Sequence, residues 1–267
     1  YSAAALSMAE KTPEPRKSEL LRMAQLLTRV PDQPATSFYE AIQSVQFFLS
    51  TLFGLYPLGR PDRYLYPYYQ QDVENGTLTR EFAQELIDCI WVKLNDLNKV
   101  RDAASAEGFA GYGLFQNLIV GGKDEHGLDV TNDLSYMCME AQLHVRLPQP
   151  SLSIRVWNCT PHSLLIKAAA VTREGMGVPA FYNDEVIIPS LISRGLTLQD
   201  ARDYNIIGCV EPQKSGKTEG WHDAAFFNML RPLELVFSQG MDKGKRIGPD
   251  TGDVVAMQTF EEFYEAY

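Results

Sequence analysis

The chain has 267 residues, of which 45% are hydrophobic and 22% are charged, a balance typical of a globular protein that can bury a core. Its formal net charge of −10 argues against binding to nucleic acid or to an anionic membrane surface. No apolar run reaches the roughly 18 residues of a membrane-spanning helix, and no signal peptide opens the sequence.

The cysteines and both ends of the sequence carry information about its context. The cysteines lie at 89, 138, 159 and 209 without a Cys-x-x-Cys pair, which favours reduced thiols in the cytoplasm. The histidines show no paired spacing of a metal site, so no bound metal is expected. Because the sequence starts at Tyr1 and stops in an aromatic and acidic stretch that reads as a helix just begun, we expect an internal fragment of a longer enzyme.

The first elements are predicted to be helices. Apolar residues recur at helical spacing within 14–30. Ser37 and Glu40 have the spacing of a capping box, in front of a mostly buried helix over 38–49.

The aromatic stretch 54–69, which contains prolines, is predicted to be a loop. Thr79 is predicted to cap the following helix, in which Cys89 falls on the apolar stripe and is expected in the core. Glycines and apolar residues over 108–122 indicate a loop that enters a buried strand.

The middle of the chain alternates helices with short apolar strands, the pattern of an α/β fold with parallel strands. Gly175 and Gly195 are predicted helix stops. The predicted helices are 133–144, one that begins at Thr160-Pro161, one that begins at Asn183 or Asp184, and one capped by Thr197; the predicted strands are 152–156 and 178–182. No linker or repeat marks a domain boundary, so 1–267 is expected to be a single fragment.

The last part of the chain is predicted to hold a helix over 224–230, which Pro232 should kink or restart. Residues 240–252 contain three glycines and a proline, and are predicted to be a loop.

The segment 204–213, Tyr-Asn-Ile-Ile-Gly-Cys-Val-Glu-Pro-Gln, has the composition of a reactive site. Two β-favouring residues run into Gly208, and a thiol at Cys209 and a carboxylate at Glu211 follow. If the backbone is extended there, residues two apart point the same way and the two groups face one space. The alternative without chemistry is that Cys209, which follows an apolar strand, is a small buried hydrophobic residue and that Glu211 is a solvated carboxylate of a loop.

This segment, with Gly-Trp-His-Asp at 220–223, resembles the cysteine loop of the glycyl radical enzymes, in their diol-dehydratase-like branch. Pyruvate formate-lyase itself has two adjacent cysteines, whereas this sequence has Val210 after Cys209. The resemblance implies a ten-stranded α/β barrel with the cysteine loop at its centre. The family's radical glycine lies in an Arg-Val-x-Gly-Tyr segment that is missing here, so the C-terminal glycine-radical domain is expected to be absent and the fragment alone inactive.

The resemblance also implies roles for four residues. Cys209 would be the thiyl radical that abstracts a hydrogen atom from a C–H bond, and Glu211 the base that removes the hydroxyl proton. Asp223, fourteen residues after the cysteine, would bind substrate hydroxyls, and Phe115 would face the substrate. His222 is read as a structural histidine.

The implied reaction is elimination of water from a small hydroxylated substrate by an anaerobic, cytoplasmic lyase, with a radical S-adenosylmethionine activase as partner, commonly as a homodimer. The glycyl radical would be the cofactor, without a directly bound metal or organic cofactor. Glycerol dehydratases carry a His-Ser pair near 54–57, where this sequence has Gly-Leu-Tyr-Pro, which argues against glycerol or propanediol. Alternatives are isethionate- or choline-type C–S and C–N lyases, hydroxyproline dehydratases and acyl lyases.

Two other classes of function stay open. A thiol hydrolase would use Cys209 with His222 and Asp223, but adjacent helical residues diverge by about 100° and orient each other poorly. A non-catalytic α/β binding domain predicts that Cys209 and Glu211 are buried with no cavity before them.

Overall fold

The computed structural model describes residues 1–51, 57–97, 102–108, 116–218 and 227–267. It separates into two compact units, Tyr1–Trp221 and His222–Tyr267, which are described separately below. The expectation of a single barrel fragment over 1–267 stays a prediction. Within the described ranges, no helix is long and apolar enough to cross a membrane.

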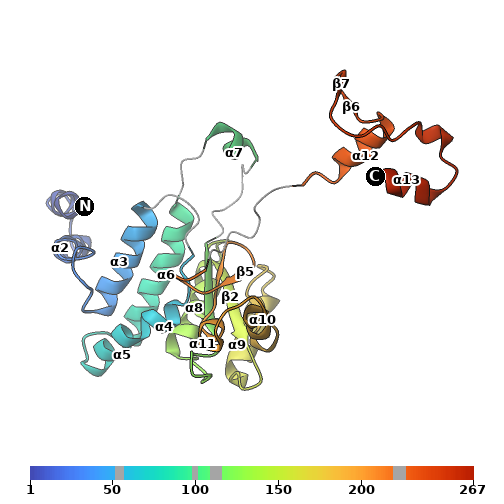
Figure 1. Cartoon of the computed structure of the whole chain (residues 1–267). Coiled ribbons are helices and arrows are strands. Elements are labelled where there is room, and N and C mark those ends of the chain that lie inside the picture. Colours follow the sequence, from blue (N-terminus) through green and yellow to red (C-terminus); the bar gives the residue numbers. More distant parts are fainter. Residues whose placement is uncertain (52–56, 98–101, 109–115, 219–226) are drawn as a thin grey trace. The chain divides into compact units, whose positions relative to one another are not determined.

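A parallel sheet lies in the middle of the larger unit (Figure 1). Its strand order is β1-β2-β3, with bounds Asn117–Gly121, Ser151–Val156 and Ala180–Asn183. Ile119 is paired with Ser153, and Arg155 with Tyr182. This parallel pairing confirms the predicted strands. A helix connects each strand to the next, as the alternating pattern indicates.

One face of the sheet packs against helices and forms the main core. Leu118, Val120, Leu152 and Ile154 are fully buried there, as alternation along the strands requires. Among the helices that contribute buried residues to this core are α3 (Phe38–Thr51), α6 (Arg80–Asp96), α8 (Asp133–Val145) and α9 (His162–Arg173).

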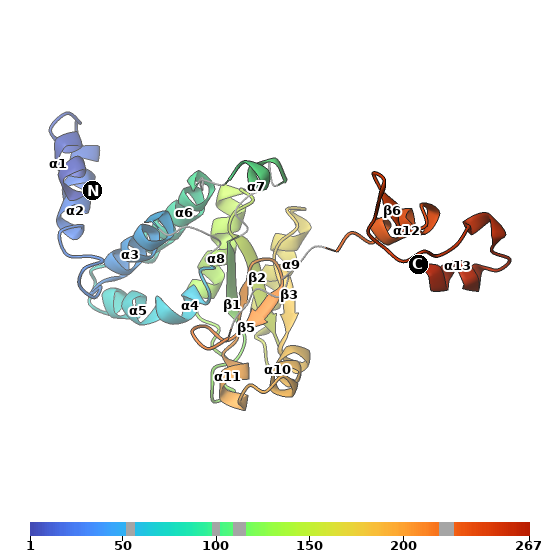
Figure 2. The ribbon, with the colours of Figure 1, turned by 45° about the horizontal axis from the view of Figure 1, so that its top comes forward.

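The other face of the sheet holds a second, smaller core. Figure 2 shows the sheet with strand β5 and helices α10 and α11 beside it. Ile119 and Tyr182 project from this face and pack with Ile206, which belongs to a β-hairpin. Two short helices, α10 (Asp184–Ser193) and α11 (Leu198–Arg202), complete the cluster. The hairpin consists of β4 (Asn205–Ile207) and β5 (Glu211–Gln213). The segment with the candidate cysteine is thereby packed directly on the sheet.

Five further helices lie in the N-terminal part of this unit: α1 (Ser2–Ala9), α2 (Arg16–Leu26), α4 (Pro61–Tyr64), α5 (Tyr66–Glu74) and α7 (Ala103–Gly108). The prediction of a loop over 54–69 is wrong for its described part. Pro61 and Pro67 stand in the first turns of α4 and α5, where a missing N–H costs nothing, so these prolines start helices.

The predicted caps at Thr79 and Thr197 are confirmed, since each side chain accepts a hydrogen bond from a backbone N–H of its helix. Of the two residues predicted to begin helix α10, Asn183 is the cap and Asp184 is the first helical residue. The capping box at Ser37 is only half formed. The Ser37 hydroxyl accepts from the N–H of Glu40 at 3.2 Å, but the Glu40 carboxylate binds Arg29 and Thr36.

Cys89 is exposed, so its predicted place in the core is wrong. The buried side of α6 is centred on Ala83, Ile87 and Ile90, and Cys89 lies on the opposite half of the helix.

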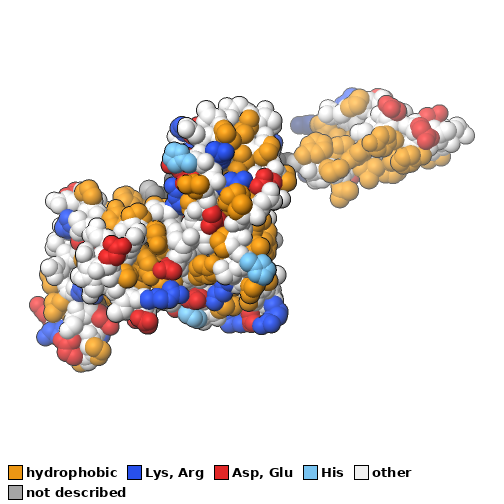
Figure 3. All heavy atoms as spheres, turned by 90° about the horizontal axis from the view of Figure 1, so that it is seen from below, with side chains coloured by type: hydrophobic (Ala, Val, Ile, Leu, Met, Phe, Trp, Pro, Cys, Tyr) orange, Lys and Arg blue, Asp and Glu red, His pale blue; other side chains and the backbone are white. Residues whose placement is uncertain are grey.

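The smaller unit contains α12 (Leu230–Phe237), a hairpin of β6 (Met241–Asp242) and β7 (Lys245–Arg246), the 3-10 turn Val254–Ala256 and α13 (Phe260–Ala266). The loop prediction for 240–252 missed this hairpin. Residues 227–229 are not helical, and Pro232 stands in the first turn of α12. Apolar side chains gather on the surface of this unit, including Phe237 and Phe260, which are 63% and 70% exposed (Figure 3).

Candidate active site

The candidate cysteine lies at the tip of the β4–β5 hairpin. The strands are antiparallel, and Ile207 is paired with Glu211, so residues 208–210 form the connecting turn. Gly208 has φ = +54°, a left-handed conformation that glycine adopts without steric cost. The extended backbone assumed from the sequence is therefore wrong between 208 and 210, because the chain reverses direction there.

The thiol and the carboxylate nevertheless come from the same tip. Cys209 is exposed and Glu211 is half-buried. The N–H of Val210 donates to Oε2 of Glu211 at 3.3 Å. A Cβ atom on Gly208 would lie 2.7 Å from the same oxygen, so the carboxylate folds back over the glycine. The non-catalytic alternative predicts that both groups are buried with no cavity before them; within residues 1–267, Cys209 is exposed and Glu211 is half-buried.

Tyr182 of β3 reaches the hairpin tip from the sheet. Its hydroxyl donates to the carbonyl oxygen of Cys209 at 3.1 Å. Burial raises the pKa of Tyr182, and the nearby Glu211 and Cys209 raise it further. No motif in the sequence signals this contact, since Tyr182 is one aromatic residue in a short strand.

A buried ion pair holds the stem of the hairpin. Arg155 and Asp184 are both inaccessible to solvent and make two hydrogen bonds of 2.8 Å. Arg155 also donates to the carbonyl oxygens of Tyr204 at 3.1 Å and Arg202 at 2.7 Å, directly before β4. The hydroxyl of Tyr204 donates to Asp184 at 2.9 Å, which closes the cluster.

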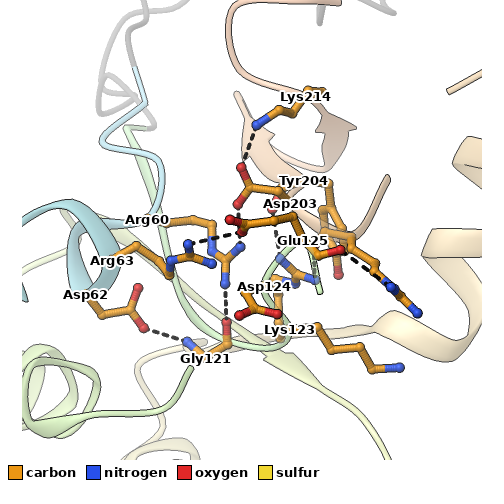
Figure 4. A network of polar contacts seen from close by, with 12 residues as sticks. Arg60, Asp62, Arg63, Gly121, Lys123, Asp124, Glu125, Asp203, Tyr204 and Lys214 are labelled. Atoms are coloured by element: carbon orange, nitrogen blue, oxygen red, sulfur yellow. Dashed lines mark hydrogen bonds and ion pairs between the residues drawn. The ribbon is translucent and has the colours of Figure 1, made fainter. Parts of the chain in front are cut away.

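A second group of charges joins the two sides of the stem (Figure 4). Asp203, before β4, accepts from Arg60 at 2.8 Å and also pairs with Lys214, which follows β5. Arg60 donates in addition to the carbonyl of Gly121 at the end of β1, at 3.1 Å. Burial lowers the pKa of Arg60 to about 10, helped by the neighbouring Arg155. Burial by itself would raise the pKa of Asp203, but the hydrogen bond from Lys214 and the charge of Arg60 outweigh burial and lower this pKa.

An open cavity of about 550 Å³ lies beside this stem. Arg60, Asn205, Ile207 and Gln213 belong to its walls. The thiol at the tip is not among the described residues that line it, so this cavity adjoins the hairpin without containing the reactive group.

Two of the four predicted site residues, Phe115 and Asp223, lie outside the described residues, as does His222. Their roles stay predictions. Across the described ranges, no group of three or more histidine, cysteine, aspartate or glutamate side chains is arranged to hold a metal ion.

Comparison with known proteins identifies relatives over the whole chain. The family model described as pyruvate formate lyase-like matches residues 1–267. A solved structure from a study of 1,2-propanediol dehydration in Roseburia inulinivorans is 60% identical, with a TM-score of 0.90 over 100% of this chain and 34% of that chain. The glycerol-bound B12-independent glycerol dehydratase of Clostridium butyricum is 54% identical, with a TM-score of 0.87 over 100% of this chain and 34% of that one.

A curated relative, (2S)-3-sulfopropanediol dehydratase of Klebsiella oxytoca, is 36% identical over 98% of this chain and 33% of its own length. The chain thus spans about a third of the proteins that it matches. The three parallel strands and the hairpin packed on them fit a piece of the α/β barrel of these structures.

Proposed function

Since the chain belongs to the pyruvate formate lyase-like family of glycyl radical enzymes, we propose that it carries the thiol hairpin of a dehydratase that acts on a small vicinal diol. The observation that carries this proposal is the position of Cys209 and of the Glu211 carboxylate at the same hairpin turn, where the carboxylate accepts from the N–H of Val210. The identities of 60% and 54% to diol-dehydrating enzymes support a diol substrate. These identities weigh against the sequence argument that the missing His-Ser pair near 54–57 excludes glycerol or propanediol. The structure describes only part of that stretch.

In the proposed reaction, the glycyl radical of the parent enzyme would take the hydrogen atom of the Cys209 thiol and leave the unpaired electron on its sulfur. Cys209 takes a hydrogen atom from the C–H bond of one hydroxyl-bearing carbon, so that an S–H bond forms and the radical moves to carbon. Glu211 accepts the proton of that hydroxyl. The neighbouring C–OH bond then breaks, the leaving hydroxide takes up the proton that Glu211 accepted and departs as water, and Cys209 returns its hydrogen atom to give the aldehyde.

The remaining parts of the proposal concern the parent protein. A radical S-adenosylmethionine activase would install the radical on a glycine outside residues 1–267. The parent would be a cytoplasmic, anaerobic enzyme and a homodimer. Asp223 would bind substrate hydroxyls and Phe115 would face the substrate.

The test uses the full-length parent enzyme, reduced anaerobically with its activase. Electron paramagnetic resonance measures the glycyl radical, and turnover is screened with 1,2-propanediol, glycerol, isethionate, choline and hydroxyproline. We expect equal radical content in the wild type and in Cys209→Ala, with dehydration of a diol in the wild type alone. Release of sulfite or an amine would replace the dehydratase assignment, and turnover that survives in Cys209→Ala would refute the role of the thiol.

A further inference from the structure

Tyr182 connects the rigid sheet to the reactive hairpin. It lies on β3 beside Arg155 of β2, on the sheet face that carries the second core. Its ring packs in one cluster with Ile119 of β1 and Ile206 of β4, and the side chain is only 9% exposed. The ring is therefore held by both the sheet and the stem of the hairpin.

The hydroxyl group of Tyr182 extends this connection to the tip. It donates to the main-chain oxygen of Cys209 at 3.1 Å, in the middle of the turn 208–210. Ser153, on the neighbouring strand, lies near enough to the phenol to lower its pKa, although its hydroxyl completes no hydrogen bond within the described part of the chain. The contact joins an exposed turn to a buried side chain.

A thiol that abstracts hydrogen must be held close to one particular C–H bond. Misplacement by about 1 Å can cost on the order of 10²-fold in rate. The backbone of a turn fixes a residue less well than packing fixes a buried ring on a strand. An anchor between the two would determine where the sulfur of Cys209 points.

We propose that Tyr182 is a positioning residue, whose hydroxyl anchors the carbonyl of Cys209 and thereby fixes the orientation of the thiol. This inference rests on the proposed role of Cys209 in hydrogen-atom abstraction. Tyr182 takes no part in the bond changes themselves.

The test compares Tyr182→Phe with the wild type in the full-length enzyme. Hydrogen exchange measured by mass spectrometry on the peptide that spans 205–214 reports the order of the hairpin without any substrate. Turnover per glycyl radical then gives kcat and KM. Tyr69→Phe is the matched control, because Tyr69 is also buried and donates through its hydroxyl, to Asp133 at 3.3 Å, away from the hairpin.

Loss of one hydrogen bond of about 1 kcal/mol predicts exchange at the tip about five times faster. We expect kcat per radical to fall about five- to tenfold, KM to stay within about twofold and radical content to be unchanged, with no effect of Tyr69→Phe. Unchanged exchange and kcat would overturn the inference, as would a loss that lies entirely in KM. If the wild type turns over none of the substrates, the proposed function fails while the exchange result still decides whether Tyr182 orders the tip.

Discussion

Replacing Asp184 by asparagine keeps the shape of the side chain but removes the charge that faces Arg155. Both residues are inaccessible to solvent, and Arg155 is joined to Asp184 by two hydrogen bonds of 2.8 Å. In Asp184→Asn the guanidinium stays buried without a counter-charge. Because Arg155 also holds the carbonyls of Arg202 and Tyr204, the change should loosen the stem of the Cys209 hairpin.

The expected magnitude follows from the complete burial of the pair. Removing one partner of a buried ion pair typically costs about 3–5 kcal/mol. Native-state hydrogen exchange of the full-length enzyme measures the local opening free energy of the β4 and β5 amides. We expect their protection factors to fall by roughly 10²- to 10⁴-fold, while amides of the distant helix α6 keep theirs.

Glu185→Gln is the matched control, because Glu185 is the next residue in the same first turn of α10. Its pair with Lys123, at 3.0 Å, is partly exposed, so its loss should cost less than about 1 kcal/mol. Equal effects of the two substitutions on the hairpin amides would refute the conclusion that the ion pair of Arg155 and Asp184 holds the stem of the hairpin. Insolubility of Asp184→Asn beside a soluble Glu185→Gln would agree with it.

Three further predictions follow from the same structure. Glu211→Gln should lower kcat by about 10²- to 10⁴-fold with the radical signal intact, and a smaller loss would exclude Glu211 as the base. Gly208→Ala should lower kcat at least about tenfold, because its Cβ would lie 2.7 Å from the Glu211 carboxylate; Gly216→Ala, at φ = +73° in open space, controls for backbone strain alone. Hydrogen bonding to Arg29 lowers the pKa of Glu40 from 4.5 to about 2, so this pair stabilises the fold above pH 4.5 and its contribution is lost as the pH falls towards 2. The difference in Tm between the wild type and Glu40→Gln should therefore be constant near neutral pH and shrink below pH 4.5, and a difference that persists to pH 2 would contradict this account.

Local signals in the sequence predicted the elements of the fold well where one short motif decides the structure. The side chains of Thr79 and Thr197 cap helices as predicted, because a cap depends on residues within one turn. The errors arise where neighbours compete. Glu40 binds Arg29 instead of completing a capping box, and Cys89 lies on the far side of α6 because other residues pack more deeply.

The candidate site was predictable only in part. The order Gly208, Cys209, Glu211 indicates a thiol beside a carboxylate, but the turn that joins them depends on antiparallel pairing of β4 with β5. The partners of Arg155 lie 29 and 49 residues away along the chain, at Asp184 and Tyr204. A single sequence contains no signal for such long-range contacts, and the same holds for Tyr182 and Cys209.

The exposure of Val210 has a consequence for how enzymes of this family diverge. Its side chain is 66% exposed, so it contributes little to either core. Pyruvate formate-lyase carries a second cysteine at the corresponding place, and a substitution to cysteine here would require no repacking of the hairpin. Within residues 1–267, the side chain at this position can therefore change while the turn and the sheet beneath it stay the same.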